Sequence, residues 1–319
     1  MKKVADSVSA KVIDVLQQFT QSSKESNWVI EQHDGGAQAS IFVVRRRDGQ
    51  PIRQRNLELV VKLYKSTRRQ SVEVVRDQFE SLSRLHAQLN GSIVNGWTID
   101  SPVPLYRCER PLALVMTRVS GKPLKSCLRT ANQVTAEALE SIADAVIAVM
   151  ERYWLADGGL YGELNFDNIL CDVSQKSLSF VDPGSLEKVF LCDTVSRHWY
   201  PASRDLAYLL YDIETSVRAT IGNPGARQRQ KCLAEKILRA FVKRTGPGYW
   251  NQCLLDEIGA CAQMHLKRIR ASWSPRGIWR LFVRQTASRS IDEILGRLRS
   301  DAVVPMTGSR AECTAGGRR

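Results

Sequence analysis

The pattern of apolar residues changes along the chain, and this change constrains the fold more than any other feature. Up to about residue 117, short apolar runs alternate with turn residues, at 28–31, 41–44, 57–64 and 112–117. Such runs are typical of strands. From residue 134 the apolar residues recur every three or four positions, which is typical of amphipathic helices. The sequence therefore predicts an α+β fold, with a small antiparallel sheet first and a larger, mostly helical part second.

Helical spacing also predicts where the individual helices lie. A leading amphipathic helix is predicted over 4–19, and its mixed polar face favours packing on the body over lying on a membrane. One helix, over 71–89, interrupts the strand region and ends at Asn90-Gly91. The remaining helices are predicted at 134–156, 203–220, 227–245, 250–270 and 276–299, with short strands and turns over 160–187.

These patterns divide the 319 residues into four segments. The leading helix takes 1–22, the sheet lobe 23–117 and the helical lobe 118–300. The end of the chain, 301–319, is rich in Gly, Ser, Thr and Arg and is predicted to be disordered. A chain of this length can bury a sizeable core.

The excess of basic over acidic residues, 46 − 33 = +13, is concentrated in two segments. Residues 45–69 and 262–300 each hold nine basic and two acidic residues. Such patches indicate an acidic partner: a nucleotide, a phosphorylated glycan, nucleic acid or anionic lipid. Solvated arginine-rich faces fit the charge equally well. No module for sequence-specific nucleic-acid recognition is present, so any binding to DNA is predicted to be sequence-blind.

Hydropathy and cysteine usage predict the compartment. No apolar run approaches the roughly 20 residues that span a bilayer, and the first residues lack an apolar signal core. The eight cysteines are scattered, without the close spacing of a zinc or redox motif, and indicate free thiols in a reducing compartment. A cytoplasmic protein is predicted, with a peripheral position on the inner membrane as the alternative.

Two features of the first lobe are typical of phosphate binding. A turn of small residues between the first two strands contains Gly35 and Gly36 and is followed by Ser40. Its backbone N–H groups could line phosphates. Lys62 lies in the middle of an apolar strand, where an unpaired charge is costly, so it needs an anionic partner.

Two loops of the second lobe offer oxygen ligands. Glu163 and Asn168 lie in one loop, and Asp182 begins an Asp-Pro-Gly turn in the other. Mg²⁺ prefers hard oxygen ligands, so the amide of Asn168 and the carboxylate of Asp182 are enough protein to hold it. The Glu163 carboxylate could accept a proton from an attacking hydroxyl. A phosphate cradle, a lysine, metal ligands and a base are the components of phosphoryl transfer.

This order of motifs resembles the protein-kinase-like superfamily, and most closely its aminoglycoside/choline phosphotransferase branch of bacterial small-molecule kinases. The catalytic loop of that branch commonly reads His-Gly-Asp-Leu-x-x-x-Asn-Ile-Leu. Here the loop reads Tyr161-Gly162-Glu163-Leu164, followed by Asn168-Ile169-Leu170. The turn 182–184 is the counterpart of the kinase Asp-Phe-Gly turn, and the resemblance covers about residues 28–215.

The resemblance implies a two-lobed kinase fold and an ATP- and Mg-dependent phosphotransferase acting on a hydroxyl of a small molecule or glycan. Lys62 would hold the α- and β-phosphates, Asn168 and Asp182 would bind Mg²⁺, and Glu163 would orient or deprotonate the acceptor. Asp205 would brace the catalytic loop. The adenine would be received by the segment that joins the lobes: Met116, Thr117, Arg118 and Val119.

Departures from the family pattern support two other hypotheses. Glu163 replaces the catalytic aspartate, and Gln78 is aligned where the glutamate partner of Lys62 usually lies, with Glu80 two residues further on. These changes support a pseudokinase-like regulator that binds nucleotide. The basic patches support a third hypothesis, a kinase of lipopolysaccharide or protein at the membrane face.

Residues 267–282 interleave Trp and Phe with arginines. This composition suits an anionic lipid interface, a phosphorylated glycan or stacked nucleic acid. The favoured prediction is a packed helix pair in which the Trp side chains are buried and the arginines face water.

Overall fold

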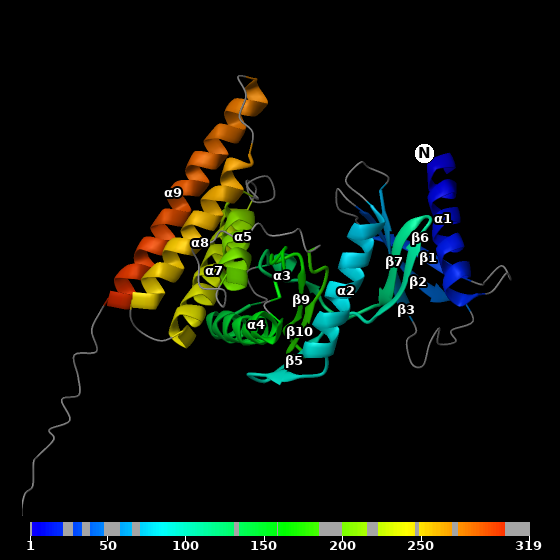
Figure 1. The fold of residues 1–319 in the computed structure, drawn as a ribbon, viewed down its shortest axis with the longest axis horizontal. Helices are drawn as coiled ribbons and strands as arrows, with labels where there is room; N and C mark the ends of the chain where they lie inside the picture. Colours follow the sequence, from blue (N-terminus) through cyan, green and yellow to red (C-terminus); the bar gives the residue numbers. More distant parts are fainter. Residues whose placement is uncertain are drawn as a thin grey trace, which may run out of the picture.

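The computed structural model describes residues 2–21, 28–33, 39–47, 58–65, 71–130, 134–157, 159–184, 200–215, 223–245, 249–269 and 274–303. It has two lobes, a sheet lobe and a larger helical lobe, which lie side by side in Figure 1. The predicted α+β class is therefore confirmed. The turn with Gly35 and Gly36 lies outside the described residues, as does the chain after Val303, where the last helix ends.

The sheet lobe is built on five antiparallel strands in the order β1-β2-β3-β7-β6. They are β1 (Trp28–His33), β2 (Ala39–Arg46), β3 (Glu58–Tyr64), β6 (Pro104–Glu109) and β7 (Leu112–Thr117). Lys62 lies on the central strand β3, opposite Ile41 of β2 and Leu114 of β7. Because side chains alternate along a strand, Lys62 and Val60 share one face of the sheet, which looks toward the helical lobe.

Two helices cover the sheet. Helix α1 (Lys2–Thr20) buries Val12, Val15 and Leu16 in a cluster with Phe42 and other apolar side chains of the outer face, so α1 packs on the body. Helix α2 (Val72–Leu89) lies on the other side and contacts β6, β7 and the helical lobe. Its N-cap is Ser71, whose hydroxyl accepts the Val74 N–H at 3.4 Å and fixes where the helix begins.

A second, smaller sheet joins the lobes. Its strand order is β4-β5-β10-β9-β8, and the pairing of β10 with β5 is parallel. The strands are β4 (Ile93–Val94), β5 (Trp97–Asp100), β8 (Lys122–Pro123), β9 (Ile169–Asp172) and β10 (Ser177–Phe180). Sequence analysis did not predict the β4–β5 hairpin. Its two-residue turn, Asn95-Gly96, has positive φ at both residues, 50° and 78°.

The helical lobe contains α3 (Leu124–Cys127), α4 (Ala136–Asp157), α5 (Tyr200–Thr215), α7 (Pro224–Thr245), α8 (Tyr249–Lys267) and α9 (Pro275–Val303). A buried carboxylate, Glu214 of α5, ties three helices together. It pairs with Arg227 at 3.0 Å and with Lys231 at 2.9 Å, both on α7, and accepts the Ser290 hydroxyl of α9 at 3.0 Å. A carboxylate that is fully buried and paired twice fixes the register of these helices.

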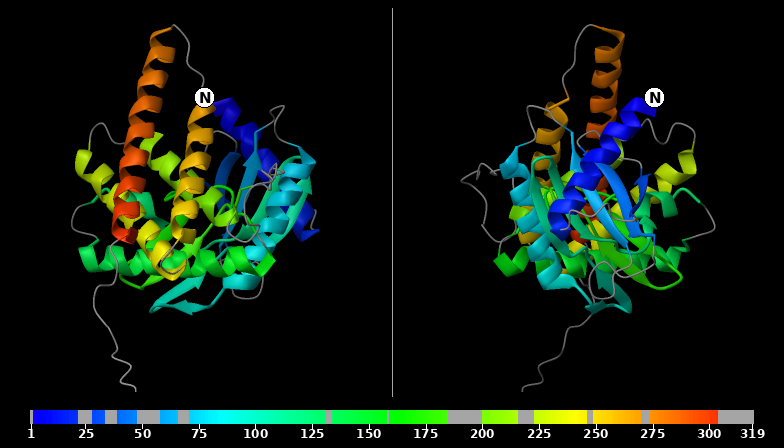
Figure 2. Two further views of the ribbon diagram at one scale, coloured as in Figure 1. Left: turned by 60° about the vertical axis from the view of Figure 1, so that its left-hand side comes forward. Right: turned by 90° about the vertical axis from the view of Figure 1, so that its right-hand side faces the viewer.

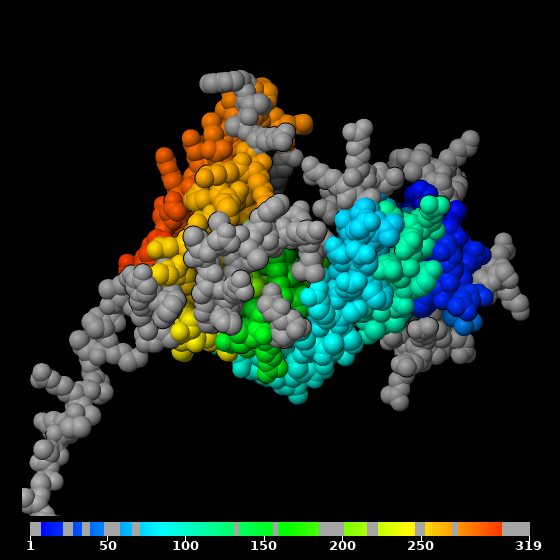
Figure 3. Space-filling view, viewed as in Figure 1, coloured from blue at the N-terminus to red at the C-terminus, as the bar shows by residue number. Residues whose placement is uncertain are grey.

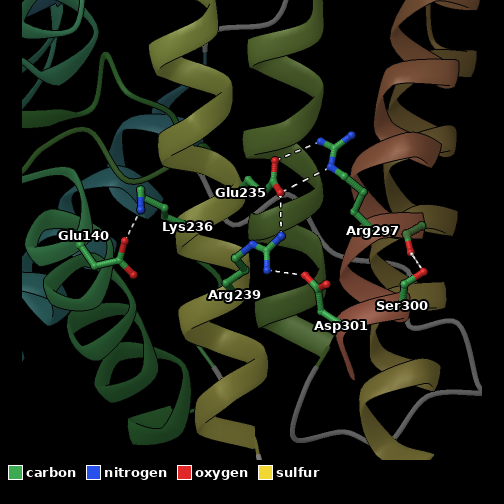
Figure 4. Close-up of polar contacts among 8 residues, drawn as sticks. Glu140, Glu235, Lys236, Arg239, Arg297, Ser300 and Asp301 are labelled. Carbon is green, nitrogen blue, oxygen red and sulfur yellow. Dashed lines mark hydrogen bonds and ion pairs between the residues drawn. The ribbon is translucent and has the colours of Figure 1, made fainter. Parts of the chain in front are cut away.

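Exposed ion pairs also connect the helices of this lobe (Figure 4). Glu235 of α7 pairs with Arg239 one turn away and with Arg297 of α9, each at 3.0 Å. Lys236 pairs with Glu140 of α4, and Arg239 with Asp301. Exposed pairs of this kind contribute about 0–1 kcal/mol each, so apolar packing holds the helices together and these pairs help to align them.

No helix of the described part of the chain is long and apolar enough to cross a bilayer.

His265 of α8 is expected to make the stability of the fold depend on pH. Its ring lies against Tyr208 and Tyr211 of α5, with centroid distances of 5.5 and 5.4 Å. Burial, aided by Arg204 and Arg268, lowers the pKa of His265 to about 4. An unfolded histidine has a pKa near 6.5, so the stability that neutral His265 provides is complete above about pH 6.5 and is lost as the pH falls toward 4.

We therefore expect the free energy of unfolding of the wild type to fall, relative to that of His265→Phe, as the pH is lowered from 7.5 to 4.5. Phe keeps a ring between the two tyrosines but does not titrate. Urea unfolding at several pH values measures the difference. A difference that does not change with pH would contradict the burial of a neutral imidazole.

Candidate active site

Lys62 meets two partners beneath the sheet. Its side chain is buried, and its ammonium donates to Gln78 Oε1 of α2 at 3.1 Å and forms an ion pair with Asp182. The structure thus brings Gln78, rather than Glu80, to the lysine. Because Gln78 is neutral, Asp182 is the carboxylate that compensates the buried charge.

Tyr64 is a member of this cluster that sequence reasoning missed. Its hydroxyl donates to Gln78 Oε1, and Lys62 Nζ lies 5.3 Å from the centre of its ring. Burial, and then the charge of Asp182, raises the pKa of Tyr64 far above its ordinary value, so the phenol stays a donor. The signal was the spacing: Tyr64 follows Lys62 by two residues and so shares its face of the strand.

The two loops that carry the predicted ligands are locked together. The Val181 N–H donates to the Asn168 carbonyl at 2.9 Å, and the Gly184 N–H donates to the Tyr161 carbonyl at 2.7 Å. Gly162 has φ +88°, and a Cβ there would lie 3.3 Å from the Cα of Gly184. Glycine at 162 therefore permits both the left-handed backbone and the close approach. The buried Tyr161 adds a hydrogen bond from its hydroxyl to the Val181 carbonyl.

Asp205, in the second turn of α5, holds the loop that carries Glu163 and Asn168. Its fully buried carboxylate accepts three N–H groups: Tyr161 N–H at 2.8 Å, Gly162 N–H at 2.7 Å and Trp154 Nε1–H at 2.8 Å. Burial raises the pKa of Asp205 to about 6, although these three hydrogen bonds act to lower it. Two of the donors are backbone groups of the loop, so Asp205 fixes the loop's conformation.

The side-chain oxygens of Asn168 and Asp182 are oriented so that they could bind a divalent cation. The Asn168 amide nitrogen donates to the carbonyls of Glu163 and Asp182, at 3.0 and 3.3 Å. These two bonds fix the amide so that its oxygen, which has no partner among the described residues, is left for a ligand. Asp182 has a left-handed φ of 53° and a partly exposed carboxylate. An amide oxygen and a carboxylate beside an open cleft suit Mg²⁺.

Glu163 lies between the two loops. A Cβ at Gly184 would lie 3.1 Å from the Cγ of Glu163, so the glutamate side chain lies directly against the Asp-Pro-Gly turn. Its charge contributes to raising the pKa of Tyr208, after burial of that phenol, which places the carboxylate near α5 as well. The side chain is half-buried and is not part of the cleft lining.

A cleft of about 650 Å³ lies between the lobes and is lined by most of the predicted residues. They are Lys62, Met116, Thr117, Arg118, Val119, Asn168 and Asp182. The floor and roof are apolar, with Ile41, Val43 and Leu170 among the lining side chains. Its volume is within the usual range for a small-molecule site.

The segment that joins the lobes presents backbone groups to this cleft. The Arg118 N–H donates to the Glu58 carbonyl at 3.4 Å, and its guanidinium pairs with the Glu58 carboxylate at 2.6 Å. Within the described residues, neither the N–H nor the C=O of Val119 is in a hydrogen bond. A free donor and a free acceptor on one cleft-lining residue suit the polar edge of a purine ring.

The structure does not bring every predicted residue to the cleft. Ser40 is paired with Leu63 and lines a separate cavity of about 350 Å³ beside α1. It therefore faces away from Lys62, because its strand neighbour Ile41 is the residue that faces the cleft. Gly35 and Gly36 lie outside the described residues.

A second lysine, Lys125, was missed by sequence reasoning. It is buried at the start of the helical lobe, and its ammonium pairs with Asp167 at 2.7 Å and Asp212 at 3.8 Å. Its backbone N–H donates to the Phe166 carbonyl at 3.0 Å. These contacts anchor the segment 166–167 of the loop that also carries Glu163 and Asn168, and no local sequence pattern predicts them.

Together these elements define a two-lobed, protein-kinase-like fold. A five-stranded sheet carries a lysine on its third strand, a helix brings a side chain to that lysine, and two loops of the helical lobe converge below it. No family model matches the sequence, and no curated protein matches it. Among solved structures, a double mutant of the PknI kinase domain of Mycobacterium tuberculosis is 13% identical, with a TM-score of 0.42 over 58% of this chain and 72% of that chain.

Proposed function

We propose that this protein is an ATP- and Mg-dependent phosphotransferase that acts on a hydroxyl group of a small molecule or glycan. The observation that carries the proposal is the convergence of Lys62, Asn168 and Asp182 at one end of a cleft. At its other end lies Val119, whose backbone groups have no partner among the described residues. Phosphoryl transfer depends mainly on positioning and on compensating phosphate charge, and these residues can do both.

Each residue has a role within this proposal. Lys62 compensates phosphate charge, the backbone at 117–119 receives the adenine, and Asn168 and Asp182 would hold Mg²⁺, which compensates charge on the phosphates. Glu163 lies five residues before Asn168 in the same loop and would accept the proton of the acceptor hydroxyl or orient it. Aspartate is the usual residue there, and glutamate has a similar ordinary pKa and differs by one methylene.

Nucleotide binding tests this proposal directly. With ATP and Mg²⁺ at roughly 100 times the dissociation constant, binding adds about 2.7 kcal/mol to the free energy of unfolding. We expect Lys62→Ala and Asp182→Ala each to abolish this gain, which is measured as the difference in melting temperature with and without ligand for the same variant. Lys243→Ala and Asp144→Ala, on α7 and α4, are matched controls that should keep it. A full shift in both site variants would refute the assignment of the nucleotide site.

A second function is favoured by one observation, the neutral partner of Lys62. With Gln78 on α2, the lysine has no carboxylate from that helix, and Asp182 takes its place. A chain of this kind could bind nucleotide and regulate a partner without turnover. The two functions differ in one measurement, because a regulator shows the nucleotide-dependent stabilisation but no ATP consumption with any acceptor. A kinase of lipopolysaccharide or protein at a membrane face is a third candidate, and its acceptor would be found with the same assay.

A further inference from the structure

The first turns of α9 carry an apolar surface that the fold leaves uncovered. Ser274 caps the helix, its hydroxyl accepting the Gly277 N–H at 3.1 Å, and Pro275 follows at the first helical position. Four large apolar side chains on the next turns are exposed: Ile278 by 54%, Trp279 by 41%, Leu281 by 37% and Phe282 by 57%. The prediction of buried Trp side chains in this segment is therefore wrong for Trp279. We call these four residues the α9 tip.

The α9 tip lies on the face of α9 that does not pack against the other helices. At roughly 100° per residue, its four side chains fall within an arc of about 160°. The residues that α9 buries further along lie on the opposite side: Val283, Ala287, Ile291, Ile294, Leu295 and Leu298. In the first turns that opposite side is taken by Arg276, Arg280 and Arg284. The tip is thus a short amphipathic segment whose apolar face is exposed to solvent.

Its position makes the tip the most projecting part of the helical lobe. The orange start of α9 extends beyond the other helices in Figure 1 and in both views of Figure 2. In the space-filling view it stands out from the body (Figure 3). The rings of Trp279 and Phe282 stack on each other, with centroids 5.7 Å apart, and form one exposed aromatic surface.

The charged residues that flank the tip in the sequence are all basic. Between Glu257 and Asp292 the sequence contains no acidic residue. It contains seven basic ones: Lys267, Arg268, Arg270, Arg276, Arg280, Arg284 and Arg289. A symmetric contact between two copies through this surface would bring two arginine-rich segments of like charge close to each other, which is unfavourable.

We propose that the α9 tip inserts its aromatic face into the interface of an anionic lipid bilayer, with its arginines directed to the phosphates. Trp and Phe on one face of a helix and arginine on the other are the chemistry of interfacial helices. Each arginine near an anionic surface is expected to strengthen binding about fivefold at low salt. This inference does not depend on the phosphotransferase activity.

Vesicle flotation tests the proposal with the full-length protein. We expect the wild type to float with phosphatidylcholine vesicles that contain about a third phosphatidylglycerol, and to bind pure phosphatidylcholine vesicles at least 10-fold more weakly. Trp279→Ser with Phe282→Ser, and separately Arg276→Glu with Arg280→Glu, should each weaken binding to anionic vesicles at least 10-fold. Leu155→Ser and Arg152→Glu on α4 make the same chemical changes elsewhere and should bind like the wild type.

The other outcomes overturn the proposal. No flotation of the wild type, or equal flotation of wild type and tip variants, means that the tip is not a lipid-binding surface. Dimerisation in sedimentation velocity that is abolished by Trp279→Ser with Phe282→Ser, in the absence of flotation, would assign the surface to a second copy. All variants change exposed side chains, and unchanged melting temperatures confirm that they fold.

Discussion

Replacement of Glu163 by Gln is expected to lower ATP-dependent phosphorylation of the acceptor by about 10²–10⁴-fold, the usual contribution of a positioned general base. Gln has the shape of Glu but cannot accept a proton. Because Glu163 does not line the cleft in which ATP is proposed to bind, the affinity for ATP should stay within about twofold of the wild-type value. Turnover over a panel of hydroxyl acceptors, together with the nucleotide-dependent thermal shift, measures both effects.

Glu163→Asp separates an adapted enzyme from a regulator. The glutamate Cγ lies against Gly184, so the position of its carboxylate depends on the full length of the side chain. In an active enzyme adapted to glutamate, Asp withdraws the carboxylate by about a bond length, and a misplacement of about 1 Å can cost roughly 10²-fold in rate. In a regulator there is no turnover to lose. If wild-type turnover equals that of Glu163→Gln across the whole panel, the enzyme proposal fails while the thermal shift still reports nucleotide binding.

Asp205→Asn is expected to destabilise the protein and to disorder the loop at 161–168. Asn offers one acceptor oxygen where the carboxylate receives three N–H groups, and its own NH₂ would face donors. A buried donor left without a partner costs about 1–3 kcal/mol, so we expect the free energy of unfolding to fall by about 2–3 kcal/mol. Asp144→Asn makes the same change at a half-buried aspartate of α4 and should have a small effect. A loss below about 0.5 kcal/mol would contradict the bracing role.

The pH dependence of the same variant provides a second check. The folded pKa of Asp205, about 6, is above the ordinary value of about 3.9. A raised pKa means that the stabilising contribution is complete below about pH 4 and is lost as the pH rises through 6. Asn does not titrate, so the loss of stability in Asp205→Asn should be larger at pH 5 than at pH 7.5. The opposite trend would show that the carboxylate is held ionised at low pH.

Several parts of this fold followed directly from sequence patterns. The expected strand at 57–64 agrees with β3 within one residue at its start, because its run of apolar residues favoured a strand. The helix expected over 71–89 agrees with α2, whose start is fixed by a serine cap. Lys62 is more than 100 residues from Asn168 and Asp182 in the sequence, yet all three line one cleft, as the order of the motifs implied.

Other parts of the fold were not predicted, some although the sequence contains a signal for them and some because only the folded structure determines them. Asn95-Gly96 is a strong hairpin signal between two short apolar runs, and it was available in the sequence. Alternation along β2 could also have placed Ser40 on the outer face, since Ile41 faces the cleft. In contrast, the partners of Lys125 come from distant segments, and the exposure of Trp279 depends on which face of α9 meets the body. Periodicity locates a helix but does not say which neighbours cover it.

The ion pair between Lys62 and Asp182 has a consequence for the order in which ligands associate. Since the two charges already compensate each other, this end of the cleft has little excess negative charge with which to attract a free cation. Under the proposed function, a nucleoside triphosphate that engages Lys62 would release Asp182 and add negative charge at the same time. We therefore expect strong positive cooperativity between nucleotide and Mg²⁺. Each should bind much more weakly alone than with the other, and the coupling should be reciprocal.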